Sequence, residues 1–169
     1  MIKYIHGSLL DSDCTCICHQ VNCQGKMNSG VAKFIREKWP NVYDEYIQNY
    51  YDVYDLIRCA IGKNGAAKAT AKALLKNVQL IPVNDNQFVV NMFAQENYGY
   101  DGERYTSYDA FYDCLLSLRE MTPATATYAF PRKIGSDRGG ANWNVIRTMI
   151  NEVLGDREVY IYTLDGEED

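Results

Sequence analysis

The stretch CHQVNCQGKMNSGVAKFI, from Cys18 to Ile35, decides the fold. It joins the end of a β-prone run, a polar loop that contains glycine, and the start of an amphipathic helix. In that helix Val31, Phe34 and Ile35 recur at the spacing i, i+3, i+4, which places their side chains on one face. A glycine directly before a helix leaves backbone N–H groups free to face a ligand, and the helix dipole favours an anion there. The loop is therefore a candidate phosphate site; a strand-to-helix connection without a ligand is the alternative.

A second stretch has the same organisation. The sequence FPRKIGSDRGGANW, Phe130–Trp143, follows the apolar run Ala124–Phe130 and precedes a helix with an apolar stripe. Its glycines, Gly135, Gly139 and Gly140, can adopt a positive φ or allow close approach of a ligand to the backbone. Two such loops at the carboxyl ends of strands in one α/β sheet face the same crevice. Neither loop matches the Walker pattern or the dinucleotide fingerprint.

Length and composition narrow the class of protein. A chain of 169 residues is long enough for one domain with its own core. The net charge of −5 and the lack of a basic tract argue against nucleic acid as the main partner. No apolar run approaches the roughly 20 residues of a membrane span. The opening MIKYIHGS reads as a strand rather than a signal peptide, so we expect no membrane association and a cytoplasmic location.

The six cysteines do not form a metal motif. Cys14, Cys16 and Cys18 alternate, so on a strand they would share one face. Metal knuckles instead use a C-x₂₋₄-C spacing, usually paired with a second cluster. We therefore expect buried, reduced thiols, no metal and no cofactor.

The other elements follow from hydrophobic periodicity. We expect strands at 3–6, 15–21, 78–83, 87–93, 124–130 and 158–164, and helices at 31–39, 42–51, 66–76 and 107–121 in addition to the one after Trp143. Strands and helices interleave around one hairpin at 78–93, which predicts a mixed sheet between helical layers. Residues 1–164 form a single domain in this interpretation, and the acidic tail 165–169 is expected to be disordered. The segment 50–76 has no assigned function.

Together the two loops resemble the macrodomain family. The resemblance runs from HGSLLDS (6–12) through HQVNCQGKMNSGVAKFI (19–35), QLIPVNDNQFVVNMFAQENYG (79–99) and YTSYDAFYDCL (105–115) to FPRKIGSDRGGANW (130–143). It implies an α/β protein with a three-layer α/β/α macrodomain fold and a mixed central sheet. The nearest branch looks like small macrodomains that process ADP-ribose 1″-phosphate or remove terminal ADP-ribose from acidic side chains.

The resemblance also implies a function. We expect a monomer that binds ADP-ribose or ADP-ribosylated protein and hydrolyses an ADP-ribose derivative. A non-catalytic reader of ADP-ribose is the alternative, and a module for another nucleotide diphosphate is a third possibility. The ligand-binding residues that the resemblance implies are Ser8, Leu9, Asn22, Asn28, Gly30, Val31, Ala32, Gly135, Ser136, Asp137, Arg138, Gly139 and Gly140. In this set, amides of 30–32 and 136–140 hold the diphosphate, and Asn22 faces the distal ribose.

The chain departs from the family pattern at two positions. Ser8 stands where an aspartate usually receives the adenine amino group, and Ala94-Gln95-Glu96 replaces the region that carries a catalytic lysine in one branch. The catalytic candidates are Asn22, Asp137 and His19, with Glu96 as a further acid or base. A histidine with an ordinary pKa can transfer protons near neutrality.

Three of the candidate site residues also have a purely structural interpretation. Asn22 can form a local Asx-type turn, His19 can be a buried strand residue, and Arg138 can be a surface residue. Tyr98 and Tyr100 are candidates for a lid over the ligand or for turn residues.

Overall fold

A computed structural model describes residues 2–99 and 101–169; Tyr100 lies outside them. One six-stranded sheet has the order β1-β6-β5-β2-β4-β3. Its strands are β1 (Ile2–His6), β2 (Cys16–Asn22), β3 (Val78–Asn84), β4 (Gln87–Gln95), β5 (Thr127–Pro131) and β6 (Glu158–Thr163). The helices are α1 (Gly30–Lys38), α2 (Pro40–Ile61), α3 (Ala66–Leu74), α4 (Tyr108–Met121) and α5 (Trp143–Leu154), with a short 3₁₀ turn η1 (Leu9–Asp11).

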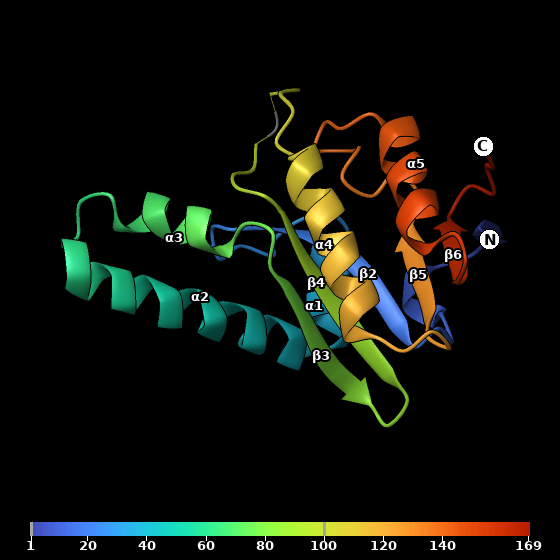
Figure 1. Cartoon of the computed structure of the whole chain (residues 1–169), viewed down its shortest axis with the longest axis horizontal. Coiled ribbons are helices and arrows are strands. Elements are labelled where there is room, and N and C mark those ends of the chain that lie inside the picture. The colour runs from blue at the N-terminus through green and yellow to red at the C-terminus, as the bar shows by residue number, and fades with distance from the viewer. Residues whose placement is uncertain (1, 100) are drawn as a thin grey trace.

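The sheet is mixed, as the sequence predicts. β3 pairs with β4 in antiparallel register, whereas β1–β6, β6–β5, β5–β2 and β2–β4 are parallel pairs. Helices cover both faces: α4 and α5 lie on one side, and α1 lies on the other (Figure 1). The predicted three-layer α/β/α architecture is therefore confirmed.

The period-2 pattern of β2 builds the two cores. Cys16 and Cys18 enter the cluster beneath α4 and α5, and Ile17 and Val21 enter the opposite cluster with Ile35 of α1. Cys14 precedes the strand and packs in the second cluster, so the expectation that all three alternating cysteines share one face is wrong. Five of the six cysteines are buried and all are unpaired with one another.

Helix α2 is much longer than predicted. Pro40 ends the expected first helix, but it also begins α2, because proline suits the first helical turn. Only Val42 and Tyr46 of α2 are fully buried, and the second half projects beyond the sheet beside α3 (Figure 1). The segment 50–76 is thus a helical hairpin. α3 also ends at Leu74, before the predicted Lys76.

The acidic tail is folded back onto the sheet. The Asp169 carboxylate accepts hydrogen bonds from Tyr4 (2.6 Å) and from the Trp143 indole (2.5 Å), and Arg132 pairs with it at 3.0 Å. The expected disorder of 165–169 is therefore wrong. The sequence did not reveal this order, because the residues that hold Asp169 are distant from it along the chain. Within the described ranges, no helix is long and apolar enough to cross a membrane.

Candidate functional site

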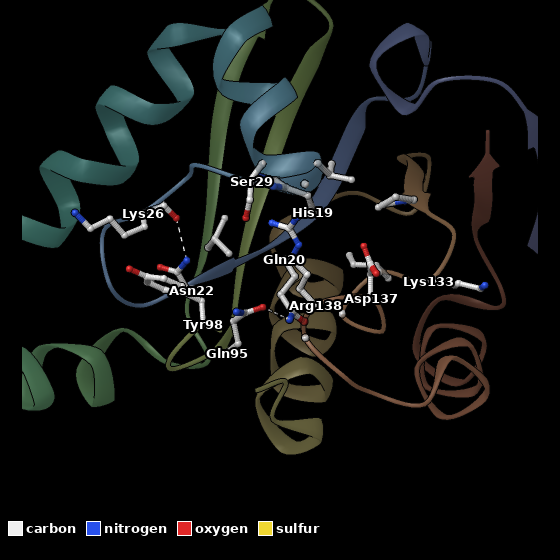
Figure 2. A pocket seen from close by; sticks show the side chains of 18 of the residues that line it. His19, Gln20, Asn22, Lys26, Ser29, Gln95, Tyr98, Lys133, Asp137 and Arg138 are labelled. Atoms are coloured by element: carbon white, nitrogen blue, oxygen red, sulfur yellow. Dashed lines mark hydrogen bonds between the residues drawn. The ribbon is translucent and has the colours of Figure 1, made fainter. Parts of the chain in front are cut away.

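A cleft of about 250 Å³ opens where β2 and β5 end (Figure 2). These strands are neighbours and parallel, so the loops that follow them meet at one edge of the sheet. The structure brings together most of the predicted residues in its lining: His19, Asn22, Asn28, Gly30, Val31, Ala32, Gly135, Asp137, Arg138 and Gly139. The described lining of the cleft does not include five other candidates: Ser8, Leu9, Ser136, Gly140 and Glu96.

The first loop leads into the amino terminus of α1. Gly30 begins the helix with φ +60°, a conformation that favours glycine. Ser29 is the cap residue, but its side chain makes no capping hydrogen bond among the described residues. The first-turn amides therefore receive no cap from Ser29, and Gly30, Val31 and Ala32 line the cleft. The positive end of the helix dipole at this position suits an anion.

Asn22 holds this loop in shape. Its Oδ1 accepts hydrogen bonds from the Gln24 amide (3.0 Å) and the Tyr46 hydroxyl (2.9 Å), and its Nδ2 donates to Lys26 O (2.9 Å). The bond to Gln24 is the Asx-type turn, which was the structural alternative. An amide nitrogen carries two protons, and one of those on Asn22 Nδ2 is used by the bond to Lys26 O.

Tyr46 is a site-supporting residue that the sequence analysis missed. Its hydroxyl lies within hydrogen-bonding distance of Asn22 O (2.8 Å) and accepts from the Lys26 amide (3.1 Å), and its ring stacks on Phe93. Burial raises the pKa of Tyr46, so the group stays a neutral phenol. In the sequence, Tyr46 is only one of several tyrosines in a helical stretch. That pattern does not reveal its partner Asn22, which lies 24 residues earlier in the chain.

The second loop is held by the segment between β4 and α4. Thr106 donates its hydroxyl hydrogen to Gly135 O (2.7 Å), and Gly139 O accepts the amides of Tyr105 (2.8 Å) and Thr106 (2.9 Å). A Cβ added to Gly139 would lie 2.4 Å from Thr106 Oγ1. Glycine is therefore required there by close packing.

His19 is buried beneath the cleft. It is 1% exposed, and its Nε2 lies 2.5 Å from Asn91 Oδ1. Burial lowers the pKa of His19 to about 4, against a weaker opposing effect of the Asn91 hydrogen bond. The imidazole is thus neutral at pH 7, and its basicity is too low for efficient proton abstraction there.

Charged side chains lie on the two lips of the cleft. Asp137 and Arg138 come from the second loop, and Lys26 comes from the first (Figure 2). Tyr98 lines the cleft near Asn22 and is 47% exposed. In the described ranges, no cluster of His, Cys, Asp or Glu has metal-binding geometry.

The remaining predicted residues have structural partners. Ser8 accepts a hydrogen bond from the Leu10 amide (3.2 Å) and caps η1, and Leu9 is 7% exposed in the core. The Ser136 hydroxyl donates to Ile134 O (3.4 Å), and Gly140 packs against the backbone of Glu103 and Arg104.

The fold and the paired loops define the class: the chain has the macrodomain fold. A macrodomain protein from Streptomyces coelicolor superposes with a TM-score of 0.72 at 21% identity, over 96% of this chain and 99% of that one. A protein of unknown function from Bacteroides thetaiotaomicron superposes with a TM-score of 0.76 at 26% identity, over 96% and 97%.

One curated relative matches over a shorter part of the chain. The ADP-ribose 1″-phosphate phosphatase of Aspergillus oryzae is 26% identical over 117 residues. The match spans 58% of this chain and 58% of the length of that relative. No protein-family model matches the sequence.

Proposed function

We propose that the cleft binds ADP-ribose and that the protein hydrolyses an ADP-ribose derivative, either ADP-ribose 1″-phosphate or an ADP-ribosyl ester on protein. The observation that carries this proposal is the pair of glycine loops that line one cleft, one of them leading into α1 at a residue, Ser29, that makes no side-chain capping bond among the described residues. The likeness to an enzyme named ADP-ribose 1″-phosphate phosphatase supports the choice of substrate class.

The diphosphate lies between the two loops in this proposal. Fixed backbone N–H groups of 30–32 stabilise its charge without reorganisation, and the dipole of α1 favours the same position. Lys26 and Arg138 both line the cleft and add positive charge to a chain whose net charge is −5. Asn22 offers its remaining N–H to the distal ribose.

Asp137 is the group that we assign to water activation. It is an exposed carboxylate on the cleft, whereas His19 is a weak base and Glu96 lies outside the described lining. A lysine adduct at the position used in one macrodomain branch does not fit this chain, because Ala94, Gln95 and Glu96 carry no amine.

A product assay separates an enzyme from a reader. The protein is incubated with ADP-ribose 1″-phosphate and with mono-ADP-ribosylated protein, and inorganic phosphate and free ADP-ribose are measured. Asp137→Ala should lower turnover by about 10²–10⁴-fold, the usual contribution of general acid–base catalysis, and should leave affinity unchanged or tighter. Asp85→Ala, an exposed aspartate in the β3–β4 turn, is the matched control.

Each outcome has a meaning. Release of phosphate identifies the phosphatase, and release of ADP-ribose identifies the ester hydrolase. Binding without either product supports the non-catalytic reader, which the lack of a strong base at His19 favours. Full turnover by Asp137→Ala would refute the role of Asp137.

A further inference from the structure

Two hydrogen-bond relays run through the sheet and end at the cleft. The first starts at Glu45 O on α2, which accepts from Gln79 Nε2 (3.2 Å). Gln79 Oε1 then accepts from Asn91 Nδ2 (3.1 Å), and Asn91 Oδ1 faces His19 Nε2. A backbone carbonyl can only accept, so the direction of every bond in this relay is fixed. His19 must therefore carry its proton on Nε2, and Nδ1 has a lone pair.

The second relay has the same polarity. It starts at Asn97 O, which accepts from Gln95 Nε2 (2.8 Å). Gln95 Oε1 accepts from Gln20 Nε2 (2.7 Å), which also donates to Thr106 Oγ1 (2.8 Å). The amide orientation of Gln20 is fixed in turn, and its Oε1 is left as an acceptor.

Both relays end on buried acceptors without a partner. His19 Nδ1 and Gln20 Oε1 are each shielded from solvent and make no hydrogen bond among the described residues. They belong to consecutive residues of β2, and both residues line the cleft (Figure 2). An unsatisfied buried polar atom costs about 1–3 kcal/mol, so the free protein holds two groups that a donor would stabilise.

We propose that His19 Nδ1 accepts a hydrogen bond from a ribose hydroxyl of the bound ligand, and that His19 is thus a sugar-positioning residue rather than the catalytic base. This inference rests on the proposed function. Nδ1 is closed to solvent in the free protein, so water does not compete for it, and the hydroxyl must displace part of the cleft wall. Ser29 lies beside His19 (Figure 2), and among the described residues its side chain makes no capping bond that would oppose such a shift.

The polarity of the relays also explains how the ligand is oriented. A phosphate near neutral pH presents mainly acceptor oxygens, which repel a lone pair. The floor at His19 and Gln20 therefore disfavours phosphate, while the amides of the first loop favour it. Together they place the diphosphate at the start of α1 and a hydroxyl-bearing sugar over β2.

The direct test is the protonation state of the His19 ring. Nitrogen NMR of the imidazole, in the wild-type protein at pH 7.5, should show a protonated Nε2 and an unprotonated Nδ1. Addition of ADP-ribose should shift the Nδ1 resonance towards the hydrogen-bonded value, whereas inorganic pyrophosphate, which has no sugar, should not. A proton on Nδ1 in the free protein would overturn the inference.

A substitution gives the energetic test. His19→Phe keeps a planar ring but removes the acceptor, and we expect its affinity for ADP-ribose in calorimetry to fall about tenfold. Its affinity for pyrophosphate should change less than twofold. His6→Phe is the matched control, because His6 is the other histidine and lies outside the described cleft lining; it should leave both affinities unchanged.

The role of His19 and the binding of ADP-ribose can be refuted separately. If ADP-ribose binds to wild-type protein but Nδ1 does not respond, or His19→Phe binds it equally well, the role of His19 is refuted and the proposed function stands. If wild-type protein binds no ADP-ribose, the proposed function fails and this inference fails with it. If His19→Phe does not fold, the NMR measurement on unmodified protein still decides.

Discussion

Individual side chains in this cleft gain their properties from partners on other strands. His19 looks like an ordinary histidine in the sequence, where a proton-transfer role is reasonable. Its register opposite Asn91 on β4 and its burial make it a neutral acceptor instead. The sequence can show that a histidine lies on a strand that leads into the loop, but it cannot show which strand pairs with it.

The buried His19 should make stability depend on pH. Unfolded chains bind a proton at histidine near pH 6.5, whereas folded His19 binds it only near pH 4. Between these values the unfolded state binds more protons, so stability rises with pH and is lost as pH falls. The full difference is about 3 kcal/mol. Chemical denaturation at several pH values should show this slope in the wild type and in His6→Phe, and a smaller slope in His19→Phe. Equal slopes in all three would contradict the burial of a neutral His19.

Asn22 should affect the ligand mainly through the loop. Asn22→Ala removes three hydrogen bonds of the first loop, so affinity for ADP-ribose and turnover should fall together. Asn84→Ala is the matched control, because Asn84 Oδ1 accepts from the Asn86 amide (2.9 Å) in a similar turn far from the cleft lining. Titration calorimetry and denaturation compare the two. A loss of affinity in both variants would show a general effect of stability.

At the scale of the elements, the positions of glycine and the periodicity of apolar residues predicted most of the strands, loops and helices. The loops after β2 and β5 were predictable, because each joins a buried run to an amphipathic helix through glycine. β5 begins at Thr127 rather than Ala124, since a turn that closes from Ala126 N to Pro123 O precedes it. The length of α2 was not predictable from its apolar positions, since its second half packs on α3 rather than on the sheet.

The start of α1 should tolerate no negative charge. Gly30→Glu places a carboxylate where the diphosphate is proposed to lie, and affinity for ADP-ribose should fall at least a hundredfold. Gly65→Glu is the matched control: Gly65 also has a positive φ (+81°), directly precedes a helix, and has open space around its Cα. Both variants should lose similar stability in thermal melts. Unchanged affinity in a folded Gly30→Glu would show that the loop does not hold phosphate.

The whole molecule shows what a local pattern cannot reveal. The tail reads as disordered because it is acidic and short, yet Asp169 joins the edge strand β1 to α5 through Tyr4 and Trp143. Such contacts depend on the final topology, which places β1 and the C-terminal tail at the same edge of the sheet (Figure 1).

Loss of this contact should weaken the fold. Asp169→Ala removes charge-assisted hydrogen bonds from a side chain that is 13% exposed, so the free energy of unfolding should fall by about 2 kcal/mol. Glu168→Ala, at an exposed neighbouring position, should change it by no more than about 0.5 kcal/mol. Equal effects of the two substitutions in denaturant titrations would contradict the structural role of the tail.

The central claim is that the cleft between the two glycine loops binds ADP-ribose. The most direct measurement is titration calorimetry of the wild-type protein with ADP-ribose, accompanied by its melting temperature with and without the ligand. We expect saturable one-site binding and a rise in melting temperature, because a ligand that binds only the folded state must stabilise it. AMP, which lacks the second phosphate and the distal ribose, should produce a smaller shift. No heat and no change in melting temperature at millimolar ADP-ribose would contradict the account.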